Sequence, residues 1–294
     1  MSDVELSVEE KIKIASGFLL SSPPGEVNDV FNDIRGIINN DEALQVGITP
    51  VLEEYNTEQL LTVTLPDTDG AVIISKHNRA DADHFIDPRS KQIFKFDHLR
   101  QIATDAQPHI AESSAEELRA VVDEAVSKYA SEHFPEGADS GAGRTGAGHD
   151  GDDVQILTIL IVSNKYSPQN FWNGRWRSIW TVNLASGEVK GRAHVVVHYY
   201  EHGNIQLNST KEFTVPTDAV GPLVDRSQIK EYARQLVKQI STSEKQYQFA
   251  LNDTYTQLSE SIFKGLRRNL PVTRNKIDWD KILNYKLGAE LAHK

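Results

Sequence analysis

Two stretches of the sequence have the residue types of a ligand site, and the first is rich in glycine. Gly141-Ala-Gly143-Arg-Thr-Gly146 matches the GxGxxG string that binds the pyrophosphate of dinucleotides. That chemistry requires the string to leave a strand and to open a helix, because the helix amides must face the phosphates. Here the string leads instead into Asp150, Asp152 and Asp153, whose charges would repel phosphate. We therefore interpret 137–153 as a loop without a nucleotide site.

The second stretch is a histidine repeat. His194, His198 and His202 recur every four residues, a spacing that gathers metal ligands only on a helix. The local alternation predicts a strand, on which His194 and His198 lie about 13 Å apart, too far to hold one ion. The sequence has no cysteine and no HExxH or GxSxG pattern, so thiolate and common hydrolase chemistry are excluded. We expect no catalytic site, no metal and no cofactor.

Charge is distributed unevenly along the 294 residues, which carry a formal net charge of −11. Residues 261–294 hold eight basic and three acidic side chains, whereas the first 260 residues hold 23 basic and 39 acidic ones, a net −16. The basic cluster Lys264–Arg274 is either a solvated helix end or an anion-binding surface. Its partner could be nucleic acid, a phosphoinositide or an acidic protein. The acidic body disfavours nucleic acid.

The N-terminal half is predicted to contain helices followed by short strands. Ser7 and Glu10 form a capping-box pattern, and apolar residues recur at helical spacing through about residue 50. Strands are expected at 61–65, 71–75, 85–86 and 92–96, and a helix at 113–134. The acidic N-terminus lacks the basic segment followed by an apolar segment that is typical of a signal peptide. No apolar run approaches the ~20 residues of a membrane span. We expect a cytosolic protein.

The second half predicts an antiparallel meander and then a long helix. Strands are expected at 154–163, 175–184, 192–201 and 204–213, joined by hairpins too short for parallel crossovers. Residues 225–263 contain no Gly or Pro, and as one helix they would be about 58 Å long. After Pro271, Asp278 caps a second amphipathic helix, which either folds back on the core or places its apolar face in a partner's groove. That face consists of Trp279, Ile282, Leu283, Leu287 and Leu291.

Several long motifs resemble the α subunit of F-actin-capping protein, in order and over about residues 8–290. They are PPGEVNDVFNDIR at 23–35, FIDPR at 85–89, FKFDHL at 94–99, NFWNGRWRSIW at 170–180, HYYEHGNIQL at 198–207 and LRRNLPVTRNKIDW at 266–279. The glycine-rich 137–153 looks longer than is usual in that family, and His202 occupies a position where a turn Asp is usual.

The resemblance implies an α+β fold in an elongated, obligate heterodimer with a β subunit. A helical N-terminal stalk would occupy 1–59, a small strand-rich region 60–112, and a helix, the glycine loop and the central antiparallel sheet 113–224. The long helix that covers the sheet would occupy 225–270, and a C-terminal amphipathic tentacle 271–294. In the family, the sheet continues across the dimer.

The resemblance also implies a function without catalysis: capping of actin filament barbed ends, independent of calcium and without severing, in the cortical actin cytoskeleton. Lys264, Arg268 and Arg274 match family residues that contact actin, and Lys264 and Arg268 would also bind inhibitory phosphoinositides. The tail residues Trp279, Ile282, Leu283, Leu287 and Leu291 would bind actin through their apolar face. The alternative is a membrane-surface adaptor that binds anionic phosphoinositides through the basic C-terminal segment.

Overall fold

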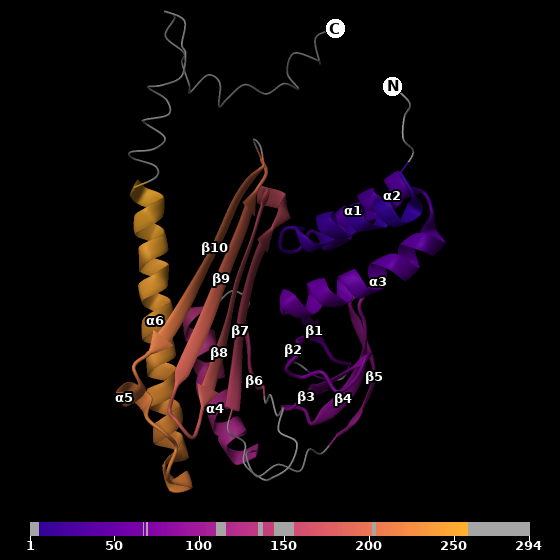
Figure 1. Ribbon diagram of the computed structural model, residues 1–294. Helices are drawn as coiled ribbons and strands as arrows, with labels where there is room; N and C mark the ends of the chain where they lie inside the picture. The colour runs from indigo at the N-terminus through magenta and orange to yellow at the C-terminus, as the bar shows by residue number, and fades with distance from the viewer. Residues whose placement is uncertain are drawn as a thin grey trace, which may run out of the picture. The chain divides into compact units, whose positions relative to one another are not determined.

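The computed structural model describes residues 6–66, 68, 70–109, 116–134, 138–143, 156–201 and 204–257 (Figure 1). The mixture of helices and antiparallel strands confirms the α+β class. The chain divides into two units, Met1–Glu244 and Lys245–Lys294. In the second unit, the described residues form the last part of one long helix. The expected tail helix at 278–293 lies outside the described residues.

Three helices begin the chain, α1 (Val8–Leu20), α2 (Val27–Ile38) and α3 (Asp41–Glu58). The capping box is confirmed: the Glu10 amide donates to Ser7 Oγ at 3.2 Å, and the Ser7 amide donates to the Glu10 carboxylate at 2.9 Å. Gly47 allows α1 and α3 to approach closely, since a Cβ there would lie 2.7 Å from Ile12 Cγ2. The three helices share one apolar core, which includes Leu19 and Tyr55.

Two small antiparallel sheets follow. The first pairs β1 (Thr62–Thr64) with β2 (Ala71–Ile73), and the second has the order β3 (His84–Asp87), β4 (Gln92–Asp97), β5 (Ile102–Pro108). Phe85, Phe94 and Phe96 fill the core of the second sheet. Strand β5 was not predicted from the sequence, because its side chains are mostly exposed and show no apolar alternation. Backbone pairing with β4 alone defines it.

The central sheet has five antiparallel strands in the order β10-β9-β8-β7-β6. Their bounds are β6 (Ala138–Gly143), β7 (Ile156–Ser167), β8 (Trp172–Asn183), β9 (Val189–Tyr199) and β10 (Ile205–Val215). The predicted four-strand meander is confirmed. The interpretation of 137–153 as a loop is wrong for 138–143, which form β6 on the edge beside β7. An edge strand needs only backbone partners, so this Gly, Ala and Ser stretch gave no apolar signal.

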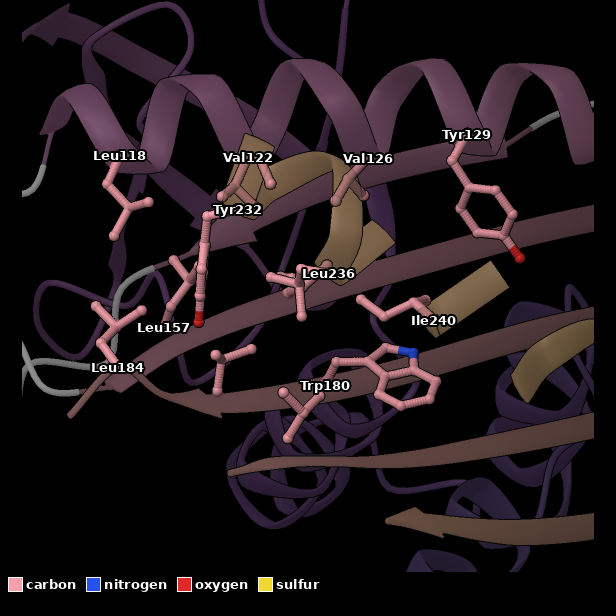
Figure 2. Packing of buried hydrophobic residues seen from close by; sticks show 14 of the residues in the cluster. Leu118, Val122, Val126, Tyr129, Leu157, Trp180, Leu184, Tyr232, Leu236 and Ile240 are labelled. Atoms are coloured by element: carbon pink, nitrogen blue, oxygen red, sulfur yellow. The ribbon is translucent and has the colours of Figure 1, made fainter. Parts of the chain in front are cut away.

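Two helices, α4 (Glu116–His133) and α6 (Ile229–Gln257), supply the residues that cover one face of the central sheet (Figures 1 and 2). Trp180 lies at the centre of this core, fully buried, with Val126 from α4 and Leu236 and Ile240 from α6 in the same cluster. The opposite face of the sheet contacts the β1–β2 region through Leu60, Ile73, Leu160 and Val162. On β8, the apolar Trp176, Trp180 and Val182 alternate with Arg175, Arg177 and Thr181, as expected for a strand whose two faces differ.

Short helical turns complete the described elements: η1 (Pro168–Asn170), α5 (Thr217–Val220) and η2 (Arg226–Gln228). The long helix was expected to begin at 225 but begins at Ile229. Asp225 explains the difference, because its carboxylate accepts from the amide and the hydroxyl of Ser227 and so holds a turn ahead of the helix.

Candidate functional site

The site residues expected from the sequence all follow the end of the described helix. Lys264, Arg268, Arg274, Trp279, Ile282, Leu283, Leu287 and Leu291 lie outside the described residues, which stop at Gln257. The described part of the chain instead presents an open sheet edge and a set of polar joints that hold its elements together.

Strand β10 forms one edge of the central sheet. All eleven of its residues pair with β9, and within the described ranges no strand pairs with its other side. An edge of this length presents unpaired amides and carbonyls that can pair with another chain. Ile205 and Leu207 are 63% and 44% exposed, and their register partners on β9 are Tyr199 and Val197. Among the described strands, β10 therefore combines an edge position in the sheet with exposed apolar side chains, the features of a protein interface.

A buried carboxylate joins α6 to the sheet and to α4. Glu244 is 0% exposed and receives three hydrogen bonds, from Ser178 Oγ at 2.5 Å, Trp180 Nε1 at 2.9 Å and the Tyr129 hydroxyl at 2.8 Å. Burial raises the pKa of Glu244, and burial together with the nearby carboxylate raises the pKa of Tyr129. Glu244 was not among the site residues predicted from the sequence. The available signal was its place in the apolar stripe of α6, four residues after Ile240.

Three of the quoted motifs meet at a second polar joint, between the N-terminal helices and the sheet. Glu26, at the start of α2, accepts from Asn173 Nδ2 on β8 at 2.8 Å. The same carboxylate oxygen lies 2.8 Å from His198 Nδ1 on β9. Asn173 and His198 are 3% and 7% exposed. The joint fixes the turn before α2 on the sheet, so His198 has a structural partner and is not a free metal ligand.

Two arginines of β8 bind the end of α3. Arg175 is 4% exposed and donates to the Gln59 carbonyl at 3.4 Å, and Arg177 donates to the Glu58 carbonyl and to the ring of His194. Cations suit a helix C-terminus, where carbonyl groups lack partners. Burial and the neighbouring Arg175 lower the pKa of Arg177 to about 10, and burial lowers the pKa of His194. His194 and His198 therefore belong to separate joints, as their strand spacing predicted.

The FIDPR motif forms a fourth joint, between the β3–β4 turn and α4. Asp87 holds the turn by accepting from the amides of Arg89 and Ser90. Arg89 donates twice to the carboxylate of Asp123 on α4, at 2.7 and 2.8 Å. Arg119 lies 8% exposed beside it and donates to the Pro88 carbonyl. The motif thus fixes the small sheet on α4.

The described residues offer no site for metal chemistry or membrane insertion. Within the described ranges, no group of three or more His, Asp or Glu side chains could hold a metal ion. No helix among those residues is long and apolar enough to cross a membrane. The expected absence of a cofactor stays a prediction.

Comparisons with known proteins identify the family. The family model for the F-actin capping protein alpha subunit matches residues 15–290. The F-actin-capping protein subunit alpha of Neurospora crassa is 39% identical over 95% of this chain and 96% of its own length. The Caenorhabditis elegans protein of that name is 39% identical over 98% of this chain and 99% of its own, and the Dictyostelium discoideum protein is 33% identical over 97% and 99%.

A solved structure supports the fold. The homodimeric actin capping protein alpha subunit from Plasmodium berghei superposes with a TM-score of 0.74 over 92% of this chain and 100% of that chain, at 23% identity. The relatives are named as F-actin-capping proteins and not as enzymes. The chain belongs to the F-actin capping protein alpha subunit family.

Proposed function

We propose that this chain is one subunit of a heterodimer that binds the barbed end of actin filaments and blocks both addition and loss of actin subunits, without calcium and without severing. The observation that carries the proposal is the family match over residues 15–290, which includes the basic cluster and the apolar tail residues Trp279, Ile282, Leu283 and Leu287. Such a protein works in the actin cytoskeleton at the cell cortex.

The proposed partner is a capping protein β subunit, and β10 is the strand that would pair with it. Antiparallel pairing along β10 would extend the central sheet across this edge and cover Ile205 and Leu207. A second copy of this chain is the alternative occupant, because the Plasmodium berghei relative is described as a homodimer. Mass measurement of the assembly with and without a β subunit distinguishes the two.

The proposed actin contact divides into a charged part and an apolar part. Lys264, Arg268 and Arg274 lie in a segment with eight basic and three acidic side chains, which complements an acidic protein surface. Opposite charge speeds encounter and fixes orientation, whereas buried apolar anchors slow dissociation. Trp279 and the Leu and Ile residues that follow at helical spacing would supply the anchor. Anionic phosphoinositides would inhibit by occupying Lys264 and Arg268.

The test replaces Lys264, Arg268 and Arg274 with Ala in the heterodimer and measures barbed-end growth from filament seeds. We expect a folded heterodimer whose capping affinity falls at least about tenfold, because these three cations would contact the acidic surface of actin directly. The matched control replaces the exposed Lys128, Lys230 and Lys238 with Ala, which removes the same charge elsewhere.

Equal affinity of the two triple variants would contradict the assigned role of the basic cluster. Binding to phosphoinositide vesicles at physiological salt, with barbed-end growth unaffected by the wild-type heterodimer, would instead support the membrane-adaptor alternative.

A further inference from the structure

Among the buried residues described on α6, Glu244 is the one that carries a charge-bearing side chain. Leu236 and Ile240 are 0% exposed and contact the sheet only through carbon atoms, and Glu244 follows one turn later, also 0% exposed. Figure 2 shows Leu236 and Ile240 in the layer between α4 and the sheet, beside Tyr129 and Trp180. A polar residue in this stripe requires a specific explanation, because a carboxylate is costly to bury unless its oxygens are hydrogen-bonded.

The surroundings of Glu244 satisfy its carboxylate from two different elements. Oε1 accepts from Ser178 and Trp180 on β8, and Oε2 accepts from Tyr129 on α4. Of these neighbours, only Tyr129 can titrate, and burial raises its pKa. The three donors therefore converge on one carboxylate of α6, between the strand and the facing helix.

Apolar contacts alone would not fix where a helix lies along a sheet. They are non-directional, so neighbouring positions of α6 that bury similar area have similar free energy. Hydrogen bonds have narrow distance and angle requirements. A shift of α6 by one turn, about 5.4 Å, would remove the carboxylate from all three donors and leave each of them buried without a partner.

We propose that Glu244 is a positioning residue that fixes the register and rotation of α6 on the central sheet, and that capping depends on this register. In the sequence, α6 is followed by the basic cluster and the tail, to which the proposed function assigns actin binding. The dependence on capping rests on the proposed function, whereas the register itself does not.

The direct test measures the position of α6 in the heterodimer. The chain has no cysteine, so Lys128→Cys on α4 and Lys238→Cys on α6, both at exposed positions, introduce the only two spin-label sites of this chain, and the β subunit is used in a cysteine-free form. Their distance distribution is measured by double electron–electron resonance for the parent, Glu244→Leu and Glu244→Gln. The control variant is Ile240→Ala, which weakens the same core one turn earlier without touching the carboxylate.

We expect Glu244→Leu to shift or broaden the distance distribution, and Ile240→Ala to leave it unchanged. Glu244→Gln should restore the parental distribution, because its carbonyl oxygen accepts from Ser178 and Trp180 and its amide can donate to the Tyr129 hydroxyl. If Glu244→Leu does not fold, Ser178→Ala removes one donor and should broaden the distribution to a smaller extent.

Capping of barbed ends supplies the second readout. If Glu244→Leu and Ile240→Ala have similar melting temperatures, Glu244→Leu should still have a capping affinity at least about tenfold lower than that of Ile240→Ala. Glu244→Gln should have the capping affinity of the parent. A parental distance distribution in both Glu244→Leu and Ser178→Ala would contradict the proposal that Glu244 fixes the register of α6. A capping loss no larger than that of Ile240→Ala would overturn its functional role. Failure of the wild-type heterodimer to cap would refute the proposed function but leave the distance result standing.

Discussion

A single methyl group added at Gly191 should destabilise the protein, because the ring of Trp180 occupies the space. A Cβ at Gly191 would lie 2.5 Å from Trp180 Cζ3 and 2.6 Å from Cδ2, well inside ordinary contact distance. The ring cannot move aside easily. It is 0% exposed, its Nε1 donates to Glu244, and it stacks on Phe213 at a centroid distance of 5.1 Å.

The magnitude follows from the cost of overpacking a filled core, about 1–3 kcal/mol for an inserted methyl group. In a chain of this size, each kcal/mol lowers the melting temperature by roughly 2–4 °C. Gly174 provides the matched control on the same face of the same sheet. A Cβ there would lie 3.7 Å from both the Lys165 carbonyl oxygen and Val197 Cγ2, so Gly174→Ala should be neutral or slightly stabilising.

The assay is urea and thermal unfolding of both variants, as heterodimers at one fixed protein concentration, because subunit association contributes to apparent stability. Trp180→Leu provides a second check: if the ring is the obstacle, Gly191→Ala should cost less in that background than in the wild type. The reasoning is refuted if Gly191→Ala and Gly174→Ala unfold together, or if the penalty at Gly191 is the same without the indole.

Three further predictions concern the joints and the open edge. Asp123→Asn should lower the free energy of unfolding by about 1–3 kcal/mol in urea titrations, because it weakens a two-bond contact to Arg89; wild-type stability would contradict this joint. Burial raises the pKa of Glu244, so the folded state binds its proton more tightly. The stability advantage of wild type over Glu244→Gln should therefore shrink as pH rises above about 4.5, and a growing advantage in urea titrations at pH 5 and 8 would be inconsistent with that burial. Leu207→Glu should reduce co-purification with a β subunit, whereas Val224→Glu, at an 87% exposed position, should not; equal yields would argue against β10 as the interface.

The sequence predicted the elements whose side chains carry a strong pattern. In β8, buried Trp176, Ser178 and Trp180 alternate with residues of the other face, so both strand and orientation were visible. The capping box of α1 was equally local, since Ser7 and Glu10 bind each other. Elements defined by backbone pairing alone, such as β5 and β6, gave no such signal.

Contacts between residues that lie far apart in the sequence could not be predicted either. Glu244 lies 64 residues from Trp180 and 115 from Tyr129, so no local pattern could bring these groups together. The same holds for Glu26 and His198, which are 172 residues apart. Glu26 and His198 lie in motifs that resemble the family, but the resemblance did not indicate their role. In the structure, they form a contact that holds α2 on the central sheet. The basic cluster and the tail lie outside the described residues, so their roles in actin binding stay predictions.

The most direct test of the account is actin elongation from filament seeds in the presence of this chain co-expressed with a β subunit. Barbed-end growth should stop at low heterodimer concentration, with and without calcium, while pointed-end growth continues and filament number stays constant. Continued barbed-end growth in the presence of a well-formed heterodimer would contradict the proposed capping function.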